Sequence, residues 1–276
     1  MKLGVTGFPP LSFRAISMWL GLPVLGALLL ARRVPFAIRR ADWPELAKLS
    51  FTNMIVWHVV AILAIQALSS GRTAILGYTM PIFSALWGVA MFGERLRPRH
   101  VAGVVAAGAG VALLLWHEFG ALSGRPVAAL AMLGAAAIWA LGTQQMRRTT
   151  IQAPTLAIVF WMTLASTLVM TLGTLLFERD KWTAPSPATW GAIAYNAVLI
   201  FGFAQAIWLI MARNLPPIAS SMSVMMIPVL GTVSGALWLN EQLHWQDGAA
   251  IVLVIVAIAS VMLPARRGAV QPVEPA

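Results

Sequence analysis

Residues 49–71 read LSFTNMIVWHVVAILAIQALSSG and contain no lysine, arginine, aspartate or glutamate. An α-helix needs about 20 apolar residues to cross the hydrocarbon core of a bilayer, so this segment is long enough to span a membrane once. The same four residue types are absent from eight other stretches, namely 15–31, 73–93, 101–117, 126–146, 149–177, 183–212, 214–240 and 248–265. The pattern predicts an all-α polytopic membrane protein with nine transmembrane helices.

The overall composition excludes a water-soluble globular protein. Hydrophobic residues make up 59% of the 276 residues and charged residues only 10%, whereas a soluble domain carries about 25% charged residues. The net charge of +10 arises mostly from basic residues in short loops between the predicted spans. We therefore expect the lipid bilayer as a partner, and no nucleic acid.

Motifs that would indicate catalysis or cofactor binding are absent from the sequence. The chain has no cysteine, which excludes disulfides and cysteine-ligated metals. It contains no Walker, zinc-ligand or nucleophile-elbow pattern. We therefore expect no catalytic residues, no metal site, no cofactor and no enzymatic activity.

The distribution of basic residues between alternate loops predicts the orientation of the chain. One set of loops, which includes the C-terminal segment 266–276, carries 13 lysines and arginines, and the other set carries 5. Cytoplasmic loops are enriched in basic residues. This rule predicts a multi-pass protein of the cell inner (plasma) membrane whose C-terminal tail, 266–276, is cytoplasmic.

An internal repeat relates the two halves of the chain. A shift of 147 residues aligns Pro81 with Pro228 and Glu94 with Glu241. The loop basic residues place Glu94 and Glu241 on opposite sides of the membrane. The chain is therefore predicted to contain two repeats with inverted orientation, an arrangement found in many transporters.

Two sequence motifs resemble those of a known family. The run Arg72-Thr-Ala-Ile-Leu-Gly-Tyr-Thr-Met-Pro81, followed by Phe92-Gly-Glu-Arg-Leu96, is similar to the fourth helix of EamA-type transporters in the drug/metabolite transporter superfamily. The run Gly7-Phe-Pro-Pro-Leu-Ser-Phe-Arg14 resembles the beginning of that family's second helix. The resemblance implies ten helices, arranged five plus five, around a central substrate cavity.

Mapped onto this chain, the family pattern implies one repeat over residues 1–117 and a second over residues 125–265. The first repeat lacks the family's first helix, because Met1-Lys2-Leu3-Gly4 resembles only the end of that helix. We expect that the sequence begins at an internal methionine. If the helix is truly absent, one wall of the cavity is open.

The resemblance and the repeat together predict a transporter that works by alternating access. The implied substrates are amino acids, related small metabolites or amphipathic drugs, with export as the commoner direction, and a homodimer is a further expected assembly. Two alternatives remain open, a non-transporting membrane partner protein and an intramembrane enzyme. The enzyme would need paired groups such as serine and histidine at depth, and His58 is the one histidine deep in a span.

Polar and aromatic side chains within the predicted spans are candidates for substrate binding, because polar groups in hydrocarbon face protein or water. His58 is either a packing residue or a group that binds a substrate carboxylate. No aspartate or glutamate lies in the middle of a span, which favours a facilitator or exchanger over a strongly ion-driven pump. The predicted substrate-binding residues are Asn53, Trp57, His58, Tyr78, Trp139, Asn196, Gln205, Trp208 and Met225.

Five other residues receive predicted roles outside direct binding. Pro81 and Pro228 interrupt backbone hydrogen bonding within their spans and are either gating hinges or sources of simple curvature. Glu94 and Glu241 each end a span, where they are expected to tie down a turn. Arg14 is expected to be a structural anchor that reaches the lipid headgroups, or else an arginine at the cavity mouth.

Overall fold

The computed structural model of the chain describes residues 5, 8–68, 73, 76–115, 126–224, 226, 227, 230 and 245–262. All regular secondary structure within these residues is helical, which confirms the predicted all-α fold class. Five helical segments in this part of the chain are long and apolar enough to cross a membrane, namely Pro10–Ala31, Arg40–Ala67, Pro126–Arg147, Thr155–Phe177 and Pro187–Asn214. Each of the nine charge-free stretches contains at least one helix, while nine as the number of membrane crossings stays a prediction.

Within the described residues, the first half of the chain contains seven helical elements. They are α2 (Pro10–Ala31), η1 (Arg40–Asp42), α3 (Trp43–Ser50), η2 (Phe51–Ile55), α4 (Val56–Ala67), α6 (Met80–Phe92) and α7 (Pro98–Leu115). The described part of the second half contains eight. They are α9 (Pro126–Arg147), α10 (Thr155–Phe177), η4 (Arg179–Lys181), α11 (Pro187–Tyr195), η5 (Asn196–Ala204), α12 (Gln205–Asn214), α13 (Pro217–Ser223) and α15 (Trp245–Met262).

Proline marks the beginning of many of these helices. Five α-helices have proline as their first residue: α2, α7, α9, α11 and α13. The first backbone N–H groups of a helix have no partner within it, so proline costs little there, and its fixed φ angle suits the helix. At the other end of α6, Gly93 adopts φ +63°, the left-handed conformation that ends helices.

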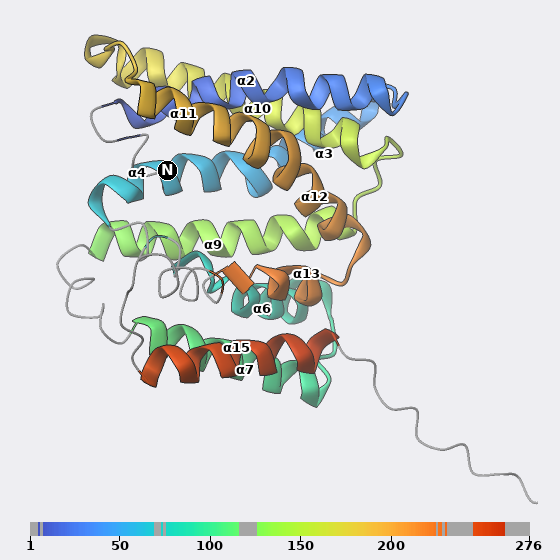
Figure 1. Cartoon of the computed structure of the whole chain (residues 1–276). Coiled ribbons are helices and arrows are strands. Elements are labelled where there is room, and N and C mark those ends of the chain that lie inside the picture. The colour runs from blue at the N-terminus through green and yellow to red at the C-terminus, as the bar shows by residue number, and fades with distance from the viewer. Residues whose placement is uncertain are drawn as a thin grey trace, which may run out of the picture.

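The helices lie roughly side by side in the bundle (Figure 1). Helix α2 packs against α10 and η5, while α9 packs against α4 and α6 near the middle of the molecule. Helices α7 and α15 pair along their lengths at the opposite side from α2 (Figure 1). The two halves of the chain therefore interleave, because α2 of the first half rests on the second half and α9 of the second half rests on the first.

Two of the long apolar segments are interrupted by π-helix. The η2 segment separates α3 from α4, and the η5 segment separates α11 from α12. A π-helix contains one extra residue in each hydrogen-bonded turn, and such segments frequently occur at functional sites. In the part of the chain that the structure describes, each half thus has one composite apolar segment with a π-helical centre.

Polar contacts tie together the loops at each end of the bundle. At one end, Glu45 accepts hydrogen bonds from Thr149 Oγ1 (2.6 Å) and Thr150 N (3.1 Å), and Arg213 donates to the carbonyl of Ile151 at 2.7 Å. At the other end, Glu178 accepts from the backbone N–H groups of α2. The predicted basic loops 32–48, 147–148 and 213 therefore gather at the same end of the bundle, which we name the basic end.

The basic end also carries an ion pair on its surface. Arg39 Nε lies 3.1 Å from Asp42 Oδ2, and the hydrogen bond together with the attraction of the carboxylate raises the pKa of Arg39. The arginine side chain is 65% exposed. The aspartate side chain is only 9% exposed, so the pair lies at the surface on its arginine side, where water weakens the interaction.

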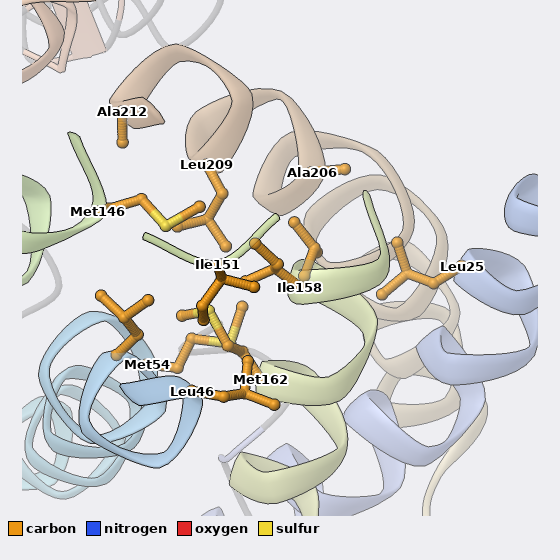
Figure 2. Close-up of a cluster of buried hydrophobic side chains, with 12 residues drawn as sticks. Leu25, Leu46, Met54, Met146, Ile151, Ile158, Met162, Ala206, Leu209 and Ala212 are labelled. Carbon is orange, nitrogen blue, oxygen red and sulfur yellow. The ribbon is translucent and has the colours of Figure 1, made fainter. Parts of the chain in front are cut away.

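A buried apolar cluster joins both halves of the chain beside the basic end. Figure 2 shows these side chains converging from several helices. The cluster, which we name the basic-end seal, consists of Leu25, Leu46, Leu49, Met54, Met146, Ile151, Ile158, Val159, Met162, Ala206, Leu209 and Ala212. Because its members come from α2, α3, η2, α9, α10, α12 and the loop before α10, the seal packs the two halves of the chain against each other.

Pro81 does not interrupt a continuous helix, as the prediction of a hinge at this position assumed. This residue is the second residue of α6 rather than the centre of a continuous helix. The helical path breaks just before it, at Tyr78 and Thr79, so proline begins a helix here instead of removing a bond from one. Pro228, Glu241, Met225 and the tail 266–276 lie outside the described residues.

Candidate substrate-binding site

A cavity of about 480 Å³ lies between the two halves of the chain. Its volume falls within the range of about 300–1,000 Å³ that is usual for small-molecule sites. Seven of the nine residues predicted to bind substrate line it: Asn53, Trp57, His58, Tyr78, Trp139, Gln205 and Trp208. The structure thus brings these residues together, while their role in binding stays a prediction.

Three tryptophans form a continuous aromatic wall of this cavity. The rings of Trp57 and Trp139 have centroids 4.4 Å apart, and those of Trp139 and Trp208 are 5.1 Å apart. Since Trp57 comes from α4, Trp139 from α9 and Trp208 from α12, the wall crosses from one half of the chain to the other.

Gly77 makes room for this wall. A Cβ atom at position 77 would lie 2.6 Å from Cη2 of Trp57, which is closer than such atoms approach in proteins. A larger residue would therefore push the Trp57 ring from its place beside Trp139.

Several polar atoms of the cavity lining have no hydrogen-bond partner among the described residues. They are Asn53 Oδ1, both ring nitrogens of His58, and the indole nitrogens of Trp139 and Trp208. Asn53 is 1% exposed and His58 is 4% exposed. Unpaired buried polar groups are costly, so these atoms are suited to pair with the polar groups of a bound molecule.

Arg14 is buried behind the cavity, with an exposed fraction of 0%. Its guanidinium carbon lies 5.6 Å from the centroid of the Phe201 ring, and the same ring stands edge-on to His58 at 5.3 Å. The expected anchor at the lipid headgroups is therefore wrong, because a fully buried side chain cannot reach the surface of the bundle. Sequence position alone suggested the end of a span, but Leu11 and Phe13 at the beginning of α2 are buried in a cluster that includes Met170 of α10 and Ile193 of α11.

Asn196 does not line the cavity, contrary to prediction. It begins η5, which packs against α2, and its side chain donates to the carbonyl of Ala192 at 2.8 Å. Close packing of Gly21 against Ala197 and Phe201 holds this part of η5 against α2.

The cavity also contains residues that the sequence did not single out for binding. They are Gly77, Ile200, Phe203, Ala204, Ile207, Met211, Ser223, Val224 and Ile227. Most are apolar, and an apolar residue within a span has the same appearance in the sequence whether it faces lipid or a cavity. For Gly77, a prediction of the helix break before Pro81 would have been the only indication that this residue lies in the cavity wall.

Glu94 connects α6 to α9 at the basic end. Its carboxylate forms an ion pair with Arg148, and Arg148 also stacks on the ring of Phe92 at 4.2 Å. The adjacent Gln144 donates to the carbonyl of Ser84 at 2.8 Å. These contacts are compatible with the expected structural role of Glu94, which stays a prediction.

The family becomes clear from comparison with known sequences. The sequence model of the EamA-like transporter family matches residues 1–116 and 126–263, that is, one match in each half of the chain. The chain belongs to the EamA-like transporter family. The resemblance noted in the sequence is thereby confirmed, and the two EamA-like repeats span the chain.

Individual relatives of this EamA-like transporter are also named as transporters. The uncharacterized transporter YoaV of Bacillus subtilis is 24% identical, covering 88% of this chain and 84% of the relative. The aromatic amino acid exporter YddG of Ancylobacter novellus is 29% identical over 72% of this chain and 69% of its own length. The uncharacterized inner membrane transporter YedA of Escherichia coli K12 is 25% identical over 95% of this chain and 85% of its own length.

The fold has a counterpart among solved structures. A protein crystal structure superposes with a TM-score of 0.79 at 25% sequence identity, covering 96% of this chain and 91% of the other. Together with the family match, this similarity establishes a multi-pass membrane transporter with the EamA two-repeat fold. Its family and relatives are transporters rather than enzymes.

Proposed function

We propose that this EamA-like transporter exports small amphipathic molecules, foremost aromatic amino acids, with related metabolites and amphipathic drugs in the same class. The proposed transport occurs by alternating access across the cell inner membrane, with the C-terminus in the cytoplasm. The observation that carries the proposal is the wall of Trp57, Trp139 and Trp208 beside unpaired polar atoms in one cavity.

The chemistry of the cavity supports a substrate that has both an aromatic ring and a polar group. Aromatic pairs gain energy from offset and edge contacts beyond the apolar area that they bury. The unpaired atoms of Asn53 and His58 supply hydrogen-bonding capacity in the same space. The name of the Ancylobacter relative, an aromatic amino acid exporter, agrees with this substrate class.

The arrangement of the two halves supports alternating access. Both halves contribute walls of the cavity, and the basic-end seal packs the two halves together near one end of the bundle. Rocking of one repeat against the other around a fixed site is the general mechanism of transporters built from repeats. No aspartate or glutamate lines the cavity within the described residues, which supports facilitated transport or exchange.

Transport by purified protein in proteoliposomes tests the proposal. Vesicles preloaded with unlabelled tryptophan should accumulate radiolabelled tryptophan, and vesicles without protein should not. Trp139→Ala should lower this exchange about tenfold by removing the centre of the aromatic wall. Absence of exchange for every aromatic amino acid, by protein that remains monodisperse, would refute the proposal.

A further inference from the structure

The side-chain amide of Asn53 is held in one orientation. Its nitrogen donates to the carbonyl of Leu49, four residues earlier, at 3.2 Å. The same nitrogen faces α9, because a Cβ atom added at Gly142 would lie 2.7 Å from it. Asn53 lines the cavity, whereas Leu49 and Gly142 are not among the lining residues. The amide oxygen, on the other edge of the group, is therefore the polar atom that Asn53 offers to the cavity.

This oxygen requires a hydrogen-bond donor. An amide oxygen accepts hydrogen bonds and never donates them. It has no partner among the described residues, and Asn53 is 1% exposed. A buried acceptor without a partner costs free energy. A ligand that brings an N–H or O–H group to this oxygen therefore gains affinity.

The aromatic rings beside Asn53 favour a donor that is also a cation. Trp57 follows Asn53 by four residues and lines the same cavity, and its ring centroid lies 4.4 Å from that of Trp139 on α9. The face of a tryptophan ring attracts cations. An ammonium group carries a positive charge and has N–H donors as well. The oxygen of Asn53 and the neighbouring rings therefore supply both interactions that an ammonium group makes, on the α9 side of the cavity.

We propose that Asn53 and Trp57 form an amino-group subsite, in which Asn53 Oδ1 accepts a hydrogen bond from the substrate's ammonium group and the ring of Trp57 contacts the same group. This inference rests on the proposed function and narrows it to aromatic molecules that carry a protonated amine. The amine strengthens binding whether or not the molecule also carries a carboxylate.

Two pairs of indole ligands test the subsite on the unmodified protein. Tryptophan and indole-3-propionate differ only by the α-amino group, and tryptamine and 3-ethylindole differ only by the terminal amine. Both members of the first pair carry a carboxylate and neither member of the second does, so the two pairs separate the amine from the net charge of the ligand. We expect the amine to lower the Kd at least about fivefold in each pair.

The outcomes for these ligands distinguish the subsite from the proposed function. Equal Kd values within both pairs would overturn the subsite and leave the proposed function intact, because the cavity would still bind indoles. A gain from the amine in only one pair would also overturn the subsite, since the contact is with the amine alone. No binding of any of the four ligands would overturn both the subsite and the proposed function.

Substitution of Asn53 tests the source of the amine preference. Asn53→Leu keeps the approximate size of the side chain and removes the amide oxygen, so the preference should fall about fivefold. The affinity for 3-ethylindole should not change. Asn196→Leu is the matched control and should keep the preference, because it removes the same hydrogen bond to the carbonyl four residues earlier but lies outside the cavity lining.

Two results with these variants would overturn the contact between Asn53 and the amine. One is an equal loss of affinity for all four ligands in Asn53→Leu, which would indicate a purely structural effect. The other is an unchanged amine preference in that variant. If Asn53→Leu does not fold, Asn53→Ala removes the same oxygen with a smaller side chain, and the same two results would overturn the contact.

Discussion

Asn53 and Asn196 make the same hydrogen bond in the two π-helical segments. Each donates its side-chain amide to the carbonyl four residues earlier, Asn53 to Leu49 at 3.2 Å and Asn196 to Ala192 at 2.8 Å. Each is 1% exposed, and in each the side-chain oxygen has no partner among the described residues. The two repeats thus share a local structure, but only Asn53 faces the cavity.

This difference predicts that the two asparagines have separate effects. Asn53→Ala should weaken substrate binding about fivefold, as expected for the loss of one hydrogen bond of about 1 kcal/mol. Asn196→Ala should leave the substrate Kd unchanged. It serves as the matched control because it removes the same hydrogen bond from the side-chain amide to the carbonyl four residues earlier. Equal effects of both variants on the Kd would show that Asn53 acts through helix structure and not through contact with substrate.

Gly77→Ala should weaken substrate binding about tenfold, because its Cβ atom would displace the Trp57 ring from Trp139. Adding Trp57→Phe should recover part of the lost affinity, since the smaller ring avoids the added carbon. Gly134→Ala is the control, as nothing lies within 4 Å of a Cβ atom at that position. If Gly77→Ala binds substrate as the unmodified protein does, the aromatic wall does not depend on this close approach.

Glu178 should stabilise the fold through the beginning of α2. Its carboxylate accepts hydrogen bonds from Leu11 N (3.0 Å), Ser12 N (2.7 Å) and Ser12 Oγ (2.8 Å), and it is 4% exposed. Loss of these bonds to a charged group costs about 2 kcal/mol, so Glu178→Ala should lower the unfolding temperature by about 5 °C.

The neighbouring acid provides the comparison for Glu178. Asp180→Ala removes an exposed carboxylate two residues further along the chain and should leave the unfolding temperature unchanged. Both variants would be followed by fluorescence during heating in detergent. A similar decrease in both would indicate a general effect of negative charge in this loop instead of a helix cap.

The absence of cysteine makes the chain suitable for accessibility measurements with single introduced thiols. Leu209→Cys, within the basic-end seal, should be protected from a membrane-impermeant maleimide in the absence of substrate, because Leu209 is fully buried. Added substrate should increase its labelling from the basic end as the repeats alternate. A labelling rate that does not respond to any transported substrate would contradict an opening of the seal during transport.

Two exposed positions serve as references for orientation in the same experiment. Gln152→Cys at the basic end should be labelled only from the cytoplasm, and Thr183→Cys at the opposite end only from outside. The reverse pattern would invert the proposed orientation of the chain.

Much of the fold could be predicted from hydropathy and charge, because the bilayer imposes the length and apolarity of each span. The cost of placing polar groups in lipid also predicted many residues of the candidate site. His58, Gln205 and Trp139 carry polar groups within apolar spans, and such groups avoid lipid. The structure brings all three to one cavity.

The remaining features depend on contacts between segments that are distant in the sequence. Arg14 looked like a residue at the end of a span, yet that end of α2 is buried in a cluster with residues of α10 and α11. Ile207 and Ile227 could not be distinguished from lipid-facing residues, because both environments are apolar. The break before Pro81 was also missed, since apolar composition continues across it.

The π-helical segment η5 makes the spacing of residues as important as their identity. Gln205 directly follows η5, Trp208 lies three residues later in α12, and both line the cavity. Each residue of an α-helix turns the chain by about 100°, so deletion of one residue between positions 196 and 204 would rotate α12 by that angle about its axis. Trp208 would then turn away from Trp139 without any change in its own codon. A single-codon deletion in this segment is therefore as severe a mutation for the cavity as the replacement of the tryptophan itself.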